Sequence, residues 1–394
     1  MKQINIGLFG FGCVGQGLFY ALQNSAGFTA DIKKIVVKDR TKERNIDASY
    51  FSFNKEDILG DATINVVIEL IDDAEEAFTI VKSAIKSGKH VVTANKKMLA
   101  LHLEELLQLK NEHNVSLLYE ASACGSIPII RTLEEYFDNE PLKDIKGVFN
   151  GTTNYMLTAI TKKGISYEQA LSEAQSAGFA ESDPTSDVEG FDAMYKTVII
   201  ALHGFGIILK PEQILRVGIN NLKLKDVAYA KKNNFDIKLV PSIRQVNDTT
   251  IAAFVLPCFV RKESHLNKIE DEYNGVVVNG LFSGEQFFLG RGAGSHPTGA
   301  AVLSDVSAIS YGYTYENKKL QQNSHLSFTN ELVIEVYLSA VNADDINSIG
   351  ISEITDSGEE ENYSFVVGKF PVAALKEQLS YIENKKIFVA YFTK

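Results

Sequence analysis

Residues 4–15 read INIGLFGFGCVG, a short apolar run followed at once by three glycines in the spacing GxGxxG. The residues after them have the apolar spacing of a helix. A strand, a glycine-rich turn and a helix form the first unit of a dinucleotide-binding domain. In such a unit Gly10 permits the tight turn, Gly12 lets a pyrophosphate approach the backbone, and Gly15 allows close helix packing. We therefore predict a cofactor loop formed by Gly10, Phe11, Gly12, Cys13, Val14 and Gly15.

Further apolar runs alternate with helical segments through the first 120 residues. The expected strands are Lys34–Val37, Asn65–Ile71, His90–Thr93 and Ser116–Glu120, with a helix over Ala74–Ser87. This alternation predicts a parallel sheet of the Rossmann type, which binds its ligands at the carboxyl ends of the strands. Thr93, Lys96 and Lys97 lie at such an end. One of the two lysines is expected to reach a cofactor phosphate or the substrate carboxylate, and a plain surface charge is the alternative for either.

The end of the second expected strand bears on the choice of cofactor. Asp39 stands where an acidic residue holds the ribose hydroxyls of NAD, whereas its neighbours Lys38 and Arg40 suit the 2′-phosphate of NADP. A plain charged loop is the alternative. The sequence leaves NAD and NADP both open.

A second informative stretch, residues 181–196, reads ESDPTSDVEGFDAMYK. It begins as a turn and enters a helix after Gly190, which places Asp192 and Lys196 on one helix face at i and i+4. Such a pair is usually a solvated salt bridge of small energy. Here the helix continues with almost no polar face, so the two charges are expected to be enclosed. The stretch is therefore a candidate active site.

Composition limits the classes of function. A chain of 394 residues is too long for one ordinary core, so two or three domains are expected. A net charge of −11 with no basic stripe argues against nucleic acid or an anionic membrane as a partner. No apolar run has the length of a membrane span and no signal-peptide pattern follows Met1, so we expect a cytoplasmic protein. The cysteines Cys13, Cys124 and Cys258 have no metal spacing and are expected to be free thiols.

We expect three domains in an α/β protein. The cofactor domain covers residues 1–130, with a returning helix near 300–316. Residues 131–317 are expected to form an α+β domain for substrate binding and dimerisation, rich in antiparallel strands. The tail, residues 326–394, is expected to form a small α+β module. It includes a strand over Ile351–Ile354 and one helix over Val372–Ile382.

Six motifs in the first 310 positions together resemble the homoserine dehydrogenase family. They are GFGCVG, VVTANKK, YEASACGSIPII, GVFNGTTNYMLT, AGFAESDPTSDVEGFDAMYK and FFLGRGAGSHPT, in that order. The resemblance implies the reversible reduction of L-aspartate 4-semialdehyde to L-homoserine with NAD(P)H, on the route to threonine and methionine. It also implies a homodimer.

Site residues follow from the resemblance position by position. Lys196 matches the catalytic lysine and Asp192 its helix partner, while Glu181 matches the acid that binds the substrate amino group. Gly151 and Thr152 match positions that contact the substrate, and Lys96 matches the lysine on the cofactor side. A structural monovalent cation, such as sodium, is implied at backbone oxygens of Glu120, Ala123, Gly125 and Ile127.

The chain departs from the family pattern in three places. Asp72 and Asp73 replace a common glycine pair near the expected nicotinamide, and Ala123 and Cys124 replace valine and glycine in the cation loop. The tail resembles a shortened ACT module whose first helix is nearly missing, so feedback inhibition by threonine is not implied.

Two other functions remain open from the sequence. One is a Rossmann-type oxidoreductase that acts on a sugar or on another semialdehyde, which would require a histidine or lysine dyad elsewhere. The other is a ligand-sensing regulator that kept the fold and lost the chemistry. The presence of Glu181, Asp192 and Lys196 argues against the regulator.

Overall fold

The computed structural model describes residues 3–393, which divide into two compact units. Unit 1 contains the chain up to Asp138 together with Arg291–Lys318. Unit 2 contains Asn139–Gly290 and the chain from Lys319 onward. Among residues 3–393, no helix has the length and apolar character needed to cross a membrane.

Unit 1 is built on a parallel sheet with the strand order β3-β2-β1-β4-β5-β6. This is the strand order of a Rossmann fold. Counted outward from β1, the strands are added first on one side and then, from β4 onward, on the other, and such sheets bind ligands at the switch point between β1 and β4. Val66, Val67 and Ile68 are fully buried, as expected for a sheet covered on both faces. The predicted Rossmann-type sheet is confirmed. Its strands are β1 (Asn5–Phe9), β2 (Asp31–Val36), β3 (Phe51–Ser52), β4 (Val66–Glu69), β5 (His90–Thr93) and β6 (Leu117–Leu118).

Helices of unit 1 begin where the sequence supplies a cap. Asp73 Oδ1 accepts hydrogen bonds from the Glu75 and Glu76 amides at 3.0 and 2.9 Å and caps α3, and Asn95 caps α4 in the same way. Asp73 therefore has a structural role. The helices are α1 (Cys13–Gln23), α2 (Glu56–Leu59), α3 (Ala74–Lys86), α4 (Lys96–Glu112), α5 (Ile129–Arg131) and α11 (Ser295–Ser310).

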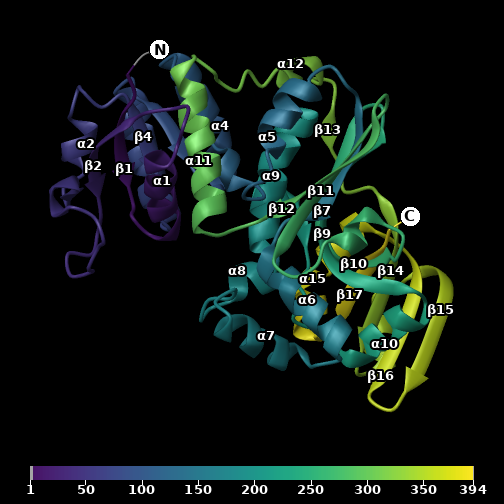
Figure 1. The fold of residues 1–394 in the computed structure, drawn as a ribbon. Coiled ribbons are helices and arrows are strands. Elements are labelled where there is room, and N and C mark those ends of the chain that lie inside the picture. Colours follow the sequence, from purple (N-terminus) through teal and green to yellow (C-terminus); the bar gives the residue numbers. More distant parts are fainter. Residues whose placement is uncertain (1–2, 394) are drawn as a thin grey trace. The chain divides into compact units, whose positions relative to one another are not determined.

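Helix α11 packs against α1 within unit 1 (Figure 1). Glycine makes this close approach possible, since a Cβ on Gly17 would lie 1.9 Å from the Ser295 carbonyl oxygen. A Cβ on Gly299 would likewise lie 2.5 Å from the Leu18 amide nitrogen. The start of α11, which includes the end of the FFLGRGAGSHPT motif, thus lies against α1, the helix that follows the glycine-rich loop.

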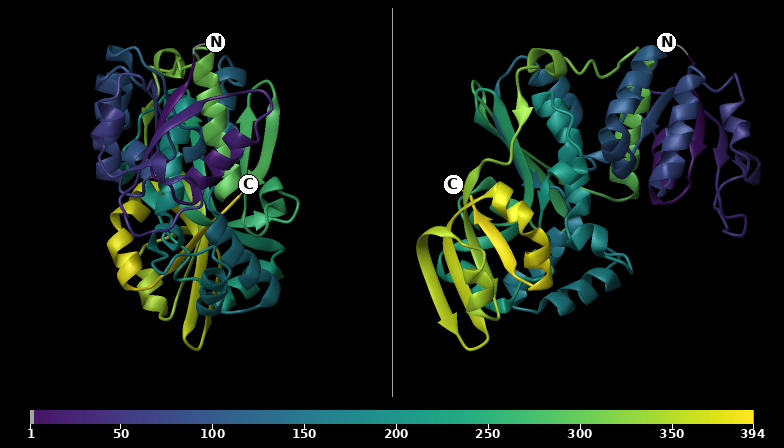
Figure 2. Two further views of the ribbon diagram at one scale, coloured as in Figure 1. Left: turned by 60° about the vertical axis from the view of Figure 1, so that its left-hand side comes forward. Right: turned by 180° about the vertical axis from the view of Figure 1, so that it is seen from behind.

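Unit 2 contains a mixed, mainly antiparallel sheet with the order β12-β11-β7-β9-β10-β17-β14-β16-β15. Strands β9 and β10 form a long hairpin, while β10 and β17 pair in parallel. Figure 2 shows the C-terminal strands, in yellow, continuing this sheet. The strands are β7 (Leu142–Val148), β8 (Leu215–Arg216), β9 (Phe235–Asn247), β10 (Thr250–Arg261), β11 (Tyr273–Gly280), β12 (Gly284–Arg291), β13 (Ser327–Phe328), β14 (Val333–Ala340), β15 (Ser352–Glu360), β16 (Tyr363–Pro371) and β17 (Phe388–Phe392).

Helix α9 is the buried helix of unit 2. It contacts β7, β9 and β10, and Val198, Ile199 and Ile200 have no exposed surface. This burial explains why the helix is apolar on nearly every side. The helices of the unit are α6 (Gly151–Lys163), α7 (Tyr167–Ser176), α8 (Thr185–Val188), α9 (Phe191–Phe205), α10 (Leu224–Lys232), α12 (Lys319–Gln322), α13 (Ala343–Asn347), α14 (Val372–Glu377) and α15 (Leu379–Asn384).

Two expectations for the tail were wrong. The helix expected over Val372–Ile382 is divided at Gln378 into α14 and α15. The strand expected over Ile351–Ile354 is longer, because β15 runs from Ser352 to Glu360 and is held by its ladder to β16.

Candidate active site

Lys196 and Asp192 lie one turn apart on α9 and form a buried ion pair. Lys196 Nζ donates to Asp192 Oδ2 at 2.7 Å and to the Phe149 carbonyl oxygen at 2.6 Å. The two side chains are only 9% and 7% exposed. The charges are enclosed, as the apolar helix indicated, and a solvated surface pair is excluded.

Asn150 joins this pair to a second carboxylate. Its Nδ2 donates to Asp192 Oδ2 at 3.0 Å and to Asp187 Oδ1 at 2.7 Å, while its Oδ1 caps α6 by accepting from the Thr153 amide. Burial, followed by the charge of Asp192, raises the pKa of Asp187. No role was predicted for Asp187, although it lies in the same motif as Asp192.

Asn274 completes the network from β11. Its Nδ2 donates to the Phe149 carbonyl oxygen at 2.9 Å, the same oxygen that accepts from Lys196. Its Oδ1 is buried and has no hydrogen-bond donor among residues 3–393. No pattern in the sequence marks Asn274, because its role depends on the pairing of β11 with β7.

Gly151, Thr152 and Glu181 are the predicted substrate residues of unit 2. Gly151 begins α6, and a Cβ on it would lie 2.7 Å from the Glu272 carbonyl oxygen, so a side chain is excluded there. Thr152 Oγ1 donates to the Phe179 carbonyl oxygen at 2.7 Å. Glu181 is exposed in the loop between α7 and α8. Their contacts with substrate stay a prediction.

The glycine-rich loop of unit 1 has the backbone geometry that a dinucleotide requires. Gly10 has φ +91°, and a Cβ on Gly15 would lie 2.7 Å from the Gly10 carbonyl oxygen. A Cβ on Gly12 would meet nothing within 4 Å, so this side of the loop is open. Gly12 precedes α1 without a side-chain cap, which leaves amides of the first turn for phosphate oxygens. The loop therefore fits the pyrophosphate of a dinucleotide.

The end of β2 holds an ordered polar turn. Asp39 Oδ1 accepts from the Thr41 amide and hydroxyl at 2.7 Å each, and these hydrogen bonds lower the pKa of Asp39. The Arg40 guanidinium lies 4.7 Å from the centre of the Phe53 ring. Asp39 and Arg40, the two residues that bear on the choice between NAD and NADP, are therefore both in contact with other residues of unit 1.

Glu69 is a buried carboxyl at the end of β4, and no role was predicted for it from the sequence. Its Oε2 accepts from Thr93 Oγ1 at 2.5 Å and its Oε1 accepts from the Ile71 amide at 2.7 Å. Burial raises the pKa of Glu69 to about 7. Asn95 Nδ2 donates to the Ile71 carbonyl oxygen at 3.0 Å. Glu69 therefore ties together the loops that carry Asp72 and Lys96.

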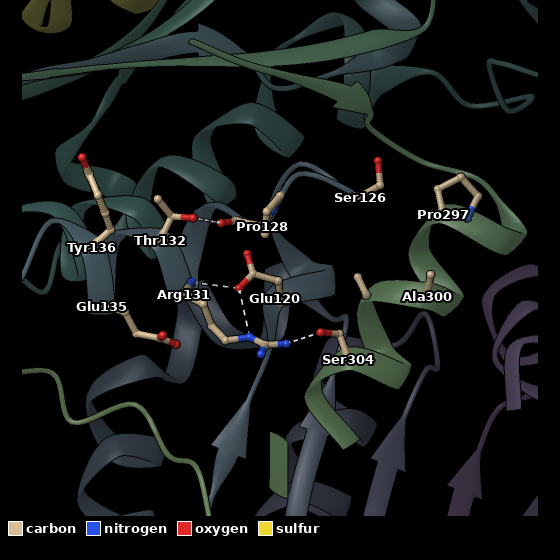
Figure 3. Close-up of a pocket in the computed structure, with 12 residues that line it drawn as sticks. Glu120, Ser126, Pro128, Arg131, Thr132, Glu135, Tyr136, Pro297, Ala300 and Ser304 are labelled. Atoms are coloured by element: carbon tan, nitrogen blue, oxygen red, sulfur yellow. Dashed lines mark hydrogen bonds and ion pairs between the residues drawn. The ribbon is translucent and has the colours of Figure 1, made fainter. Parts of the chain in front are cut away.

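The loop after β6 also contains a buried carboxyl. Glu120 accepts from the Ile130 and Arg131 amides at 2.7 and 2.9 Å, and its own amide donates to Asp305 Oδ2 at 2.8 Å. Burial raises the pKa of Glu120 to about 7. Arg131 lies 3.6 Å from Asp305 Oδ1 and also contacts Ser304. Glu120, Arg131 and Ser304 line a pocket with a volume of about 440 Å³, and Figure 3 shows their side chains.

The backbone of this loop turns sharply where a cation was predicted. Cys124 and Gly125 have φ values of +55° and +60°, a conformation that a cysteine adopts at a cost. Among residues 3–393, no three His, Cys, Asp or Glu side chains are grouped to hold a metal. A cation at this loop would therefore depend on backbone oxygens, and the site stays a prediction for Glu120, Ala123, Gly125 and Ile127.

Known proteins match the chain in both units. A family model described as homoserine dehydrogenase matches residues 128–307, and one described as its NAD binding domain matches residues 10–120. The homoserine dehydrogenase of Bacillus subtilis is 39% identical over 318 residues, which cover 78% of this chain and 73% of the relative. That of Lactococcus lactis is 37% identical over 317 residues, covering 78% and 74%.

Solved structures agree with the sequence matches. A homoserine dehydrogenase from Thiobacillus denitrificans superposes with a TM-score of 0.87 at 28% identity, covering 100% of this chain and 99% of that one. A hyperthermophilic archaeal homoserine dehydrogenase in complex with NADPH gives a TM-score of 0.69 at 26% identity, covering 80% and 99%. With relatives above 30% identity over most of both chains, this chain belongs to the homoserine dehydrogenase family.

Proposed function

We propose that this protein catalyses the reversible reduction of L-aspartate 4-semialdehyde to L-homoserine with a nicotinamide cofactor, with Lys196 as the proton donor. The observation that carries the proposal is the buried ammonium of Lys196, held by Asp192 and the Phe149 carbonyl oxygen. These two bonds use two of its three hydrogens. One hydrogen remains for the substrate oxygen.

The reaction requires a charge-stabilising proton donor at that oxygen. When bound, the reduced nicotinamide supplies a hydride to the aldehyde carbon. The negative charge that develops on the oxygen is stabilised by the Lys196 ammonium, which then donates its proton. In the direction of homoserine oxidation, the neutral amine of Lys196 accepts the hydroxyl proton. Asp192 orients the lysine in both directions, and Asn150 orients Asp192.

Residues of unit 2 hold the substrate in this proposal. The carboxylate of Glu181 meets the substrate ammonium, while Gly151 and Thr152 contact the substrate at the start of α6. An amide of this first helical turn is suited to the substrate carboxylate, since helix N-termini favour negative charge.

Residues of unit 1 hold the cofactor. The loop from Gly10 to Gly15 takes the pyrophosphate, Arg40 takes the 2′-phosphate when the cofactor is NADP, and Thr93 and Lys96 lie on the nicotinamide side. We assign Glu120, Ala123, Gly125 and Ile127 to a monovalent cation through their backbone oxygens. The functional form in this proposal is a homodimer.

Homoserine oxidation tests the proposal directly. The purified protein is incubated with L-homoserine at alkaline pH, and nicotinamide absorbance is followed with NAD and NADP in parallel. Turnover with either cofactor is expected, and sodium against potassium at fixed ionic strength reports on the cation. Cofactor binding without turnover would instead favour another semialdehyde as substrate.

A further inference from the structure

A second cavity lies wholly within unit 2. The proposed function assigns no role to it. We infer that this cavity binds a small organic anion. It has a volume of about 260 Å³ and is bordered by α6, α10, β9 and the segment that joins β10 to β11. It is lined by Leu157, Thr158, Thr161, Lys162, Lys231, Asp236, Ile237, Lys238, Lys262, Asn267 and Glu270.

Lys238 places a buried positive charge at this cavity. It is 4% exposed, and its Nζ donates to Asn154 Oδ1 at 2.8 Å and to the Ile269 carbonyl oxygen. Both acceptors are neutral, although buried charges are normally paired with an opposite charge. Burial lowers the pKa of Lys238 to about 8; Lys162 acts in the same direction, and the carboxylates of Asp236, Glu270 and Asp271 oppose it. The ammonium is therefore short of a negative partner.

The other charges at the cavity do not supply that partner. Lys162 Nζ lies 2.6 Å from Glu270 Oε2, and Lys262 Nζ lies 2.6 Å from Asp236 Oδ1, so both acids are already paired. The exposed side chain of Lys231, near the end of α10, has no hydrogen bond or ion pair with any residue from 3 to 393. Among the residues that line the cavity, Lys231 at its exposed side and the buried Lys238 thus carry positive charges that no carboxylate pairs. This combination favours an anion with charge-assisted hydrogen bonds.

Asn267 indicates a second property of the ligand. Its Oδ1 is buried and accepts no hydrogen bond within the described residues. A buried acceptor without a donor is costly unless a ligand or water supplies one. A hydroxyl or amino group beside the anionic group would supply that donor.

One helix joins this cavity to the Lys196 network. Asn150, the N-cap of α6, and Asn154 and Thr158 within the helix stand at i, i+4 and i+8, so they lie on one side of α6. Asn150 bonds Asp192, Asn154 bonds Lys238, and Thr158 lines the cavity. An anion that draws Lys238 toward the cavity would also act on Asn154, because Asn154 Oδ1 accepts the hydrogen bond of Lys238.

Binding is measured by calorimetry on the full-length protein, with malonate and inorganic phosphate as separate probes at constant ionic strength. We expect one saturable site per chain, about tenfold weaker in Lys231→Ala, as for the loss of one charge-assisted hydrogen bond. Lys232→Ala is the matched control, because it removes the same charge from the next residue of α10 and does not line the cavity. A Lys238→Met variant should lose binding.

The two probes distinguish the possible ligands. Binding of malonate alone would indicate a carboxylate ligand, and binding of phosphate alone would indicate a phosphoryl ligand. Competition between malonate and phosphate would indicate one site that accepts both oxyanions. The inference is overturned if neither probe saturates, or if Lys231→Ala and Lys232→Ala weaken binding equally. Because binding is measured without substrate or cofactor, its failure would leave the proposed activity untouched.

Discussion

Lys196 Nζ and Asp192 Oδ2 lie 2.7 Å apart on consecutive turns of α9, with both side chains at most 9% exposed. A buried pair of this kind contributes little net stability, because desolvation offsets much of the attraction. The pair instead fixes the position of the lysine, because the Asp192 carboxylate holds the ammonium next to the Phe149 carbonyl oxygen.

Asp192→Asn should lower kcat by about a hundredfold. General acid catalysis typically contributes a factor of this size, and it is lost when the proton donor is no longer held in position. The amide can still accept from Lys196 but no longer carries the charge that holds the ammonium. Steady-state kinetics of homoserine oxidation give kcat and KM. The matched control is Asp248→Asn, in the exposed turn between β9 and β10, and equal effects of the two changes would contradict the role of Asp192.

Gly12→Ala should weaken cofactor binding by at least about tenfold while changing thermal stability little, since an added Cβ meets no protein atom within 4 Å. The methyl group would occupy the space that the pyrophosphate needs. Gly15→Ala should instead lower the melting temperature, because its Cβ would lie 2.7 Å from the Gly10 carbonyl oxygen. Fluorescence titration with NADPH and thermal unfolding separate the two effects. Gly27→Ala, also in open space, should do neither, and normal NADPH binding by Gly12→Ala would refute the assignment of the loop.

Arg40→Ala should raise KM for NADP by about tenfold and leave KM for NAD nearly unchanged, as expected for loss of one charge-assisted bond to a phosphate. Parallel kinetics with both cofactors test this. Lys42→Ala, two residues away, removes the same charge and serves as control. A variant in which both KM values rise together would place Arg40 outside the 2′-phosphate site.

Glu69→Gln should flatten the dependence of stability on pH. The pKa of Glu69 is about 7 in the folded protein against 4.5 when unperturbed, so the native state holds a proton that the unfolded chain releases between these values. The wild type therefore loses stability as pH rises from about 4.5 to 7, by an amount on the order of 3 kcal/mol from this group. Urea unfolding at pH 5 and pH 8 measures the difference, and an unchanged difference in Glu69→Gln would show that this carboxyl is not responsible.

The sequence contained enough information to predict the cofactor half of the fold. GFGCVG and the alternating apolar strands specify a Rossmann sheet, because the pattern reflects burial of every strand on both faces. The tail was harder: β15 is polar and almost wholly exposed, so its extension to Glu360 comes from backbone pairing with β16 rather than from its side chains.

The same distinction applies to the candidate site. Lys196 and Asp192 could be predicted, since they are four residues apart on one apolar helix. Asn274 and Glu69 could not, because each gains its role from residues brought close by sheet pairing, Phe149 in one case and Thr93 in the other. A polar residue at the end of a strand gives no sign in the sequence of which neighbour it will meet.

The most direct test of the account is homoserine oxidation by Lys196→Met, compared with Lys163→Met, which removes an exposed lysine paired with Glu173. We predict that Lys196→Met loses turnover by about a thousandfold or more while its affinity for NADPH stays within about twofold of the wild type. Lys163→Met should remain active. Retention of most of the wild-type kcat by Lys196→Met, in a folded protein that binds NADPH, would contradict the assignment of Lys196 as the proton donor.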